Sequence, residues 1–119
     1  METRKLHEGE YRFMDLIWRM EPVNSTVLAK AALAELGWKK STSYTVLRKL
    51  KDRGFVGGEG AVVQSLISRS QVQQEESREI VEKSFGGSLP AFVTAFLKDR
   101  KLSKEEAQEL RRMIEEASE

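Results

Sequence analysis

The stretch KKSTSYTVLRKLKDRG, from Lys39 to Gly54, predicts an amphipathic helix with two distinct faces. At about 100° of rotation per residue, the side chains suited to a protein core gather on one side: Ser43, Val46, Leu47 and Leu50. The opposite side carries polar and aromatic side chains: Ser41, Tyr44, Thr45, Arg48 and Asp52. One face therefore packs against a core, and the other is free to meet a partner.

The same stretch concentrates positive charge. It holds six basic residues and one acid, whereas the whole 119-residue chain has a formal net charge of only +1. A basic helix on an otherwise mildly acidic chain indicates contact with a polyanion, most simply DNA. A solvated basic face on an ordinary amphipathic helix would show the same pattern, so this stretch alone leaves both interpretations open.

Two helices are predicted before the basic one. Residues 7–20 carry an apolar stripe at helical spacing, made of Tyr11, Phe13, Met14, Ile17 and Trp18. A second helix begins after Asn24 or Ser25 and runs to about Leu36, where Gly37 ends it. Its expected packing face consists of Val27, Leu28, Ala31, Ala32 and Leu33. A tight glycine-containing turn then leads into the basic helix, which predicts a helix-turn-helix.

A β-hairpin is predicted directly after the basic helix. Apolar runs within residues 55–56 and 61–67 flank a glycine-rich turn from Gly57 to Gly60. A hairpin in this position makes the helix-turn-helix a winged helix. No Arg or Lys lies between Arg53 and Arg69. Strong phosphate contact by cationic wing side chains is therefore not expected, although backbone N–H groups can contribute.

Three further helices are predicted, each opened by a serine cap: Ser68, Ser88 and Ser103. The first runs to about Phe85 and is nearly all polar over residues 71–79, which is typical of an exposed connector. We therefore expect a winged-helix DNA-binding domain over residues 1–70 and a helical dimerisation domain over residues 71–119. The predicted fold class is mainly α with a small β-hairpin.

The tail has more apolar surface than a segment of about 50 residues buries alone. The stretch 89–98 is apolar nearly all round, and the last helix carries an apolar stripe. The expected homodimer interface consists of Phe85, Leu89, Phe92, Val93, Phe96, Leu97, Leu110, Met113 and Ile114. The alternative is a monomer in which the tail folds back onto the first domain.

The composition argues against several functions. With no cysteine and a single histidine, His7, the chain offers no thiolate or histidine cluster for a metal or a nucleophile. It contains neither of the phosphate-cradling glycine motifs, so no enzyme activity, metal site or cofactor is expected. No apolar run reaches about 18 residues, and the charged start METRKLHEGE lacks a signal-peptide core. We expect a cytoplasmic protein without membrane insertion.

Several short groups of residues, spread along nearly the whole chain, stand in a particular order. They are Glu10, Tyr11, Met14 and Trp18, then Gly37-Trp38, then Thr42, Thr45, Leu47, Leu50 and Gly54, then Leu66-Ile67-Ser68, Phe85-Gly86-Gly87-Ser88-Leu89 and Leu102-Ser103. In this order the chain resembles the penicillinase-repressor family of bacterial winged-helix regulators (BlaI/MecI/CopY).

The resemblance implies a homodimeric repressor in which each recognition helix reads one half of a palindromic double-stranded DNA operator. The expected DNA-contacting residues are, by matched position, Trp38, Lys39, Lys40, Ser41, Thr42, Tyr44 and Thr45 and, by charge, Arg48 and Lys49. The four cations Arg48, Lys49, Lys51 and Arg53 are expected to touch phosphate or solvent. Hydroxyl groups can bond base edges or phosphates, a threonine methyl can pack on thymine, and lysines neutralise phosphate.

The resemblance also implies a mode of induction. In the β-lactam branch of the family, a membrane-bound sensor protease cuts within the apolar helix, before a phenylalanine. The matching bond here joins Ala95 and Phe96, of which only the phenylalanine matches. The copper-responsive branch carries a cysteine-rich metal site, which a chain without cysteine excludes.

The chain departs from the family pattern at three places. Tyr44 stands where the family often has a basic residue, Lys39-Lys40 replaces the usual Ser-Pro, and the wing lacks a basic tip. Lysine is a poor helix cap, so the recognition helix loses its best first residues. The alternative function is a winged-helix protein-interaction module that docks its hydroxyl and Tyr44 face on a protein.

Overall fold

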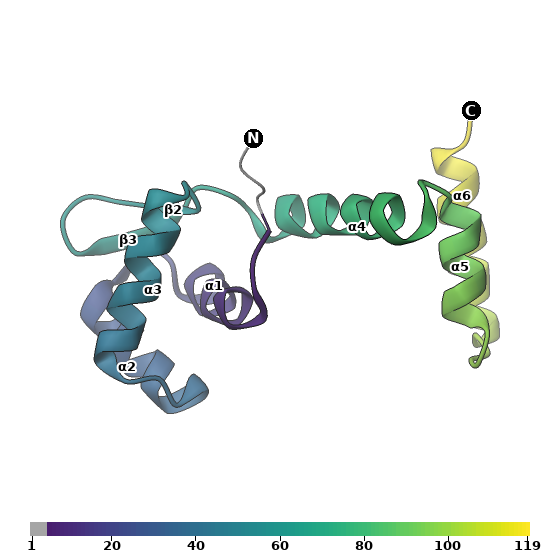
Figure 1. Ribbon diagram of the computed structural model, residues 1–119. Coiled ribbons are helices and arrows are strands. Elements are labelled where there is room, and N and C mark those ends of the chain that lie inside the picture. The colour runs from purple at the N-terminus through teal and green to yellow at the C-terminus, as the bar shows by residue number, and fades with distance from the viewer. Residues whose placement is uncertain (1–4) are drawn as a thin grey trace. The chain divides into compact units, whose positions relative to one another are not determined.

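The computed structural model describes residues 5–119 (Figure 1). Residues 1–4, with which the charged start and the expected 1–70 domain begin, lie outside the described residues. The chain forms two compact units, one up to Glu79 and the other Ile80–Glu119. The expected fold class is confirmed, because the described residues are mainly helical and include a small antiparallel sheet.

The first unit contains the predicted helix-turn-helix. Its helices are α1 (Glu8–Met20), α2 (Ser25–Leu36) and α3 (Lys40–Asp52). The Asn24 side chain accepts a hydrogen bond from the Thr26 N–H at 2.8 Å and so caps α2. At the end of α2, Gly37 has φ 70°, a left-handed conformation that lets the chain turn into α3. Lys39 caps α3 without a side-chain hydrogen bond, as its residue type predicts.

A three-stranded antiparallel sheet completes the first unit. Its strands are β1 (Val23–Asn24), β2 (Val56–Gly57) and β3 (Val62–Ser65), in the order β1-β3-β2. β2, β3 and the loop between them form the predicted hairpin, here called the wing. Its turn requires Gly58, because a Cβ there would lie 2.1 Å from the Val62 carbonyl oxygen. The sequence did not predict β1, because two residues are too few to show the alternation of apolar and polar side chains that marks a strand.

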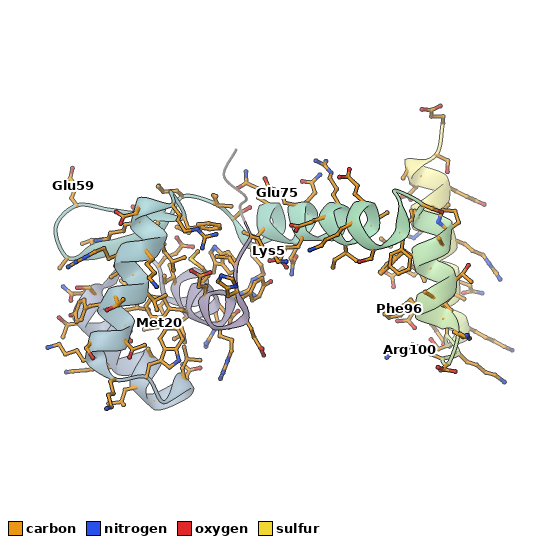
Figure 2. The ribbon with its side chains drawn as sticks, viewed as in Figure 1. Lys5, Met20, Glu59, Glu75, Phe96 and Arg100 are labelled. Carbon is orange, nitrogen blue, oxygen red and sulfur yellow. The ribbon has the colours of Figure 1, made fainter. Side chains whose placement is uncertain are left out.

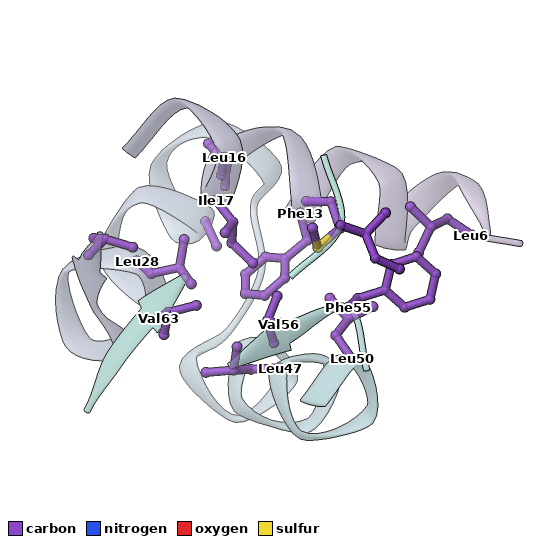
Figure 3. Close-up of a cluster of buried hydrophobic side chains, with 14 of the residues drawn as sticks. Leu6, Phe13, Leu16, Ile17, Leu28, Leu47, Leu50, Phe55, Val56 and Val63 are labelled. Atoms are coloured by element: carbon purple, nitrogen blue, oxygen red, sulfur yellow. The ribbon is translucent and has the colours of Figure 1, made fainter. Parts of the chain in front are cut away.

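Side chains from the three helices and the sheet form one core, with Phe13 of α1 in its middle (Figure 3). The inward face of α2 differs from the expected one. Leu28, Ala29 and Ala32 are buried, whereas Val27 and Leu33 are 49% and 59% exposed. Because α2 is apolar on most sides, its sequence alone does not determine which face turns inward.

The second unit is built from helices alone. α4 (Arg69–Phe85) begins in the first unit and ends in the second, and α5 (Leu89–Leu97) and α6 (Lys104–Ala117) follow. The three predicted serine caps are confirmed, because the hydroxyls of Ser68, Ser88 and Ser103 each accept a backbone N–H three residues on. Within residues 80–119, all of which the structure describes, no side chain is fully buried.

Candidate nucleic-acid interface

The core determines which face of α3 meets solvent. Ser43, Leu47 and Leu50 are buried against the rest of the unit, and Val46 is half-buried, as the helical periodicity predicts. This packing turns the opposite face of α3 outward. The exposed side chains on it include Lys40, Ser41, Thr42, Thr45, Arg48 and Lys49.

Tyr44 joins the start of α3 to the start of α2. Hydrogen bonds from the side chains of Thr26 and Ser25 lower the pKa of Tyr44, and the charge of Lys40 acts in the same direction, while burial opposes them. The Lys40 ammonium lies 5.9 Å from the centre of the Tyr44 ring. Three hydroxyls and a cation therefore gather where α2 and α3 begin.

Ser25 and Thr26 are site residues that the sequence did not reveal. Their position at the start of α2 identifies them as helix-opening residues, and only the packing of α2 against α3 brings them to Tyr44. Thr45 lies one residue further along α3, where its hydroxyl donates to the Ser41 carbonyl oxygen at 2.9 Å. The Thr45 oxygen keeps its acceptor capacity, so the side chain can still bind a donor.

Trp38 packs within the first unit. Its ring stacks on Phe13, with ring centres 5.3 Å apart and planes 22° from parallel. Gly9 of α1 lies beside the same indole, where a Cβ would be 3.4 Å away, at van der Waals contact distance. The half-buried Trp38 ring thus anchors the turn between α2 and α3 to α1.

Arg53 forms an ion pair within the first unit. Its charge predicts contact with phosphate or solvent, and in the structure its guanidinium donates to both carboxylate oxygens of Glu10, at 3.0 and 2.9 Å, and to the Lys5 carbonyl oxygen. Its guanidinium carbon also lies over Phe55, 4.9 Å from the ring centre. Arg53 therefore joins the end of α3 to α1.

The wing presents an acid at its tip. Glu59 projects from the loop between β2 and β3, next to Gly58 and Gly60 (Figure 2). The nearest basic residues along the chain are Arg53 and Arg69, and both are engaged with α1. The positive charge available for phosphate therefore lies on α3 and not on the wing.

The expected dimer interface lies on exposed and half-buried faces of the second unit. Phe85, Phe92 and Phe96 form a row, with ring centres 5.5 Å apart for the first pair and 6.2 Å for the second. The predicted interface residues that remain exposed are Leu89, Val93, Phe96, Leu110, Met113 and Ile114, and Leu97 is half-buried. Ala95 and Phe96, at the expected cleavage site, both lie in α5 and are exposed. Arg100 lies over Phe96, 4.7 Å from its ring centre (Figure 2).

Two features are absent from the described residues. Across residues 5–119, no helix has the length and apolar character needed to cross a membrane. In the same part of the chain, no three His, Cys, Asp or Glu side chains are grouped so that they could hold a metal ion.

The first unit is a helix-turn-helix followed by a hairpin, and its α3 exposes basic and hydroxyl-bearing side chains. These features define the winged-helix class of nucleic-acid-binding domains. The family model described as Penicillinase repressor matches residues 6–116. The chain belongs to the penicillinase repressor family, whose members are DNA-binding transcriptional repressors and not enzymes.

Curated relatives match along nearly their whole length. The methicillin resistance regulatory protein MecI of Staphylococcus aureus (strain Mu50 / ATCC 700699) is 23% identical over 117 residues, which cover 95% of each chain. The protein of the same name from Mammaliicoccus sciuri is 22% identical over 117 residues, with the same coverage. The penicillinase repressor of Bacillus licheniformis is 26% identical over 116 residues, covering 94% of this chain and 91% of that one.

Proposed function

We propose that the chain is a homodimeric repressor that binds a palindromic operator through α3. The observation that carries the proposal is the outward face of α3, where hydroxyls and lysines are exposed while the opposite face is held in the core. Ser41, Thr42, Tyr44 and Thr45 supply groups that bond base edges or nearby phosphates. Lys39, Lys40, Arg48 and Lys49 supply charge for phosphates, and Trp38 holds the turn before them.

Dimerisation is supported by the surface of the second unit. Its apolar side chains include Phe96 at 52%, Met113 at 50% and Ile114 at 62% exposed, and exposed apolar groups in this number mark an interaction surface. We assign DNA binding to residues 1–70 and dimerisation to residues 71–119. Sedimentation equilibrium at micromolar concentration is expected to give twice the 13.6 kDa chain mass, and a monomer would contradict this assignment.

Proteolytic inactivation forms part of the proposal through the Ala95–Phe96 bond. Both residues are exposed in α5, where local opening of a short helix makes a bond accessible to a protease. The partner would be a membrane-bound sensor protease. Mass spectrometry of the protein recovered from induced cells is expected to find fragments that end at Ala95 and begin at Phe96. Full-length protein alone would contradict this part.

Binding to DNA from upstream of the chain's own gene tests the main function. In a gel-shift experiment the full chain is expected to retard this duplex at submicromolar concentration and to lose affinity steeply as salt is added. Failure to bind DNA, together with capture of a protein through the Tyr44 face, would favour the protein-interaction module instead.

A further inference from the structure

The base of α4 is fastened to α1 by separate contacts. The Trp18 Nε1–H donates to the Ile67 carbonyl oxygen at 2.9 Å. Arg69, the first residue of α4, pairs with Asp15 at 2.5 Å, and its guanidinium lies 4.9 Å from the centre of the Trp18 ring. Val72, almost one turn further on, is fully buried in the core. The first turn of α4 is therefore part of the first unit.

The ion pair at this base holds its charge at neutral pH. The hydrogen bond from Arg69 lowers the pKa of Asp15, burial opposes it, and the charges of Arg69 and Arg19 lower the pKa further. Asp15 also accepts from the Arg19 Nε at 3.2 Å, and Arg19 in turn pairs with Glu35 of α2 at 2.9 Å. Arg19 thus holds the Asp15 carboxylate in place while Arg69 binds it.

The buried side chain of α4 and its ion pair with Asp15 both lie at this base. Within α4, all of which is described, only Val72 is buried. Further along, Glu79 pairs with Lys5 at 3.8 Å, but these side chains are 41% and 52% exposed, and such pairs contribute little. At 1.5 Å per residue, the 17 residues of α4 extend about 25 Å, so a tilt of about 10° at the base moves the far end by about 4 Å.

We propose that Asp15, Trp18 and Arg69 are positioning residues that set the half-site spacing recognised by the dimer. This proposal rests on the proposed function. α4 continues from the first unit into residues 80–119, which belong to the region 71–119 that we expect to dimerise, so its direction places each recognition helix relative to the two-fold axis. Neighbouring base pairs are about 3.4 Å apart along the duplex, so a displacement of about 4 Å corresponds to roughly one base pair.

The test measures affinity as a function of half-site spacing. It uses the full chain and a duplex obtained by repeated selection from randomised DNA, with derivatives in which one or two base pairs are added or removed between the half-sites. Arg69→Ala and Asp15→Asn both break the ion pair, but they change the net charge in opposite directions. Each variant is expected to lose about fivefold in affinity at the selected spacing and less at the other spacings. The spacing profile therefore flattens in both variants.

Arg78→Ala is the matched control. Arg78 is an exposed residue of the same helix, so its removal subtracts the same charge, and the wild-type profile is expected to persist. A duplex with a single half-site provides a second readout. The affinity of Asp15→Asn and Arg69→Ala for this duplex is expected to differ from the wild-type affinity by no more than that of Arg78→Ala does.

Three outcomes are distinguishable. Flattened profiles with unchanged half-site affinity support the positioning role. Profiles that keep the wild-type shape, or losses that are equal at every spacing and at the half-site, overturn it while leaving the proposed function intact. A wild-type chain that selects no duplex overturns the proposed function itself.

Discussion

Arg53, the residue that follows α3, donates hydrogen bonds to both carboxylate oxygens of Glu10 in α1. Glu10 also accepts from the His7 N–H at 2.9 Å, so one carboxylate holds the first turn of α1 and the end of the recognition helix together. The Glu10 and Arg53 side chains are 13% and 28% exposed, which makes this the most shielded of the ion pairs among the described residues. Arg53 thus sets the position of α3.

Replacing Glu10 with Gln is expected to lower the free energy of unfolding by about 1–2 kcal/mol at pH 7, between the values typical of exposed and buried ion pairs. Burial raises the pKa of Glu10, but the His7 amide and Arg53 outweigh it, so the pKa lies below its usual value. A lowered pKa gives stability that is complete above the unfolded-state pKa and is lost as pH falls through the folded-state pKa.

Urea unfolding measured between pH 7 and pH 3 checks this prediction. The difference between wild type and Glu10→Gln is expected to shrink as the pH falls below about 4.5, because Glu10 is protonated first in the unfolded state and then, at its lower pKa, in the folded state. Glu8→Gln removes an exposed acid from the same turn and serves as the control. A difference that stays constant down to pH 3 would show that the charge of Glu10 is not what stabilises the fold.

Ser43 is buried on the core side of α3, and its hydroxyl has no hydrogen-bond partner within the part of the chain that the structure describes. Ser43→Ala is expected to raise the free energy of unfolding by about 1 kcal/mol, because an unsatisfied buried hydroxyl is removed. Ser41→Ala, at an exposed position of α3, controls for the higher helix propensity of alanine. If Ser43→Ala stabilises no more than Ser41→Ala, the hydroxyl is not an energetic cost.

Lys39 and Lys40 open α3 and are exposed. Alanine at either position is expected to weaken DNA binding by about threefold to tenfold on every sequence and to reduce the slope of log affinity against log salt by about 0.9. Fluorescence anisotropy on specific and unrelated duplexes measures both quantities. Lys104→Ala in α6 removes the same charge away from α3 and is expected to leave the slope unchanged. Loss confined to the specific duplex would mean that the lysines read bases.

Glu59 at the wing tip offers a test of where the wing lies in the complex. Glu59→Lys keeps Gly58 and Gly60, so the turn is preserved, and it adds a cation where the chain has an acid. Affinity for all duplexes is expected to rise severalfold, with a salt slope steeper by about one phosphate contact. Glu59→Gln is expected to give an intermediate affinity. An unchanged affinity in both variants would place the wing away from the phosphates.

Local signals in the sequence account for most of the fold. The serine caps, Gly37 and the apolar side of α3 each depend on residues a few positions apart, so their patterns are visible along the chain. The strand β1 is too short to leave such a pattern, and α2 is too uniformly apolar to reveal its inward face.

The candidate site depends more on contacts between distant residues. Arg53 and Glu10 are 43 positions apart, and nothing local distinguishes Arg53 from an exposed cation such as Lys51. The approach of Ser25 and Thr26 to Tyr44, and the stacking of Trp38 on Phe13, likewise arise from the packing of whole helices. Residue type predicted which face of α3 is exposed, and tertiary structure decides which cations remain on that face.

Selection of randomised duplex DNA by the full wild-type chain, followed by sequencing of the bound fraction, tests the central claim most directly. The account predicts enrichment of an inverted repeat whose half-site centres are separated by about 34–36 Å, one helical turn, as two α3 helices of a symmetric dimer require. Enrichment of no sequence above the unselected pool, or of a single half-site without its inverted copy, would contradict it.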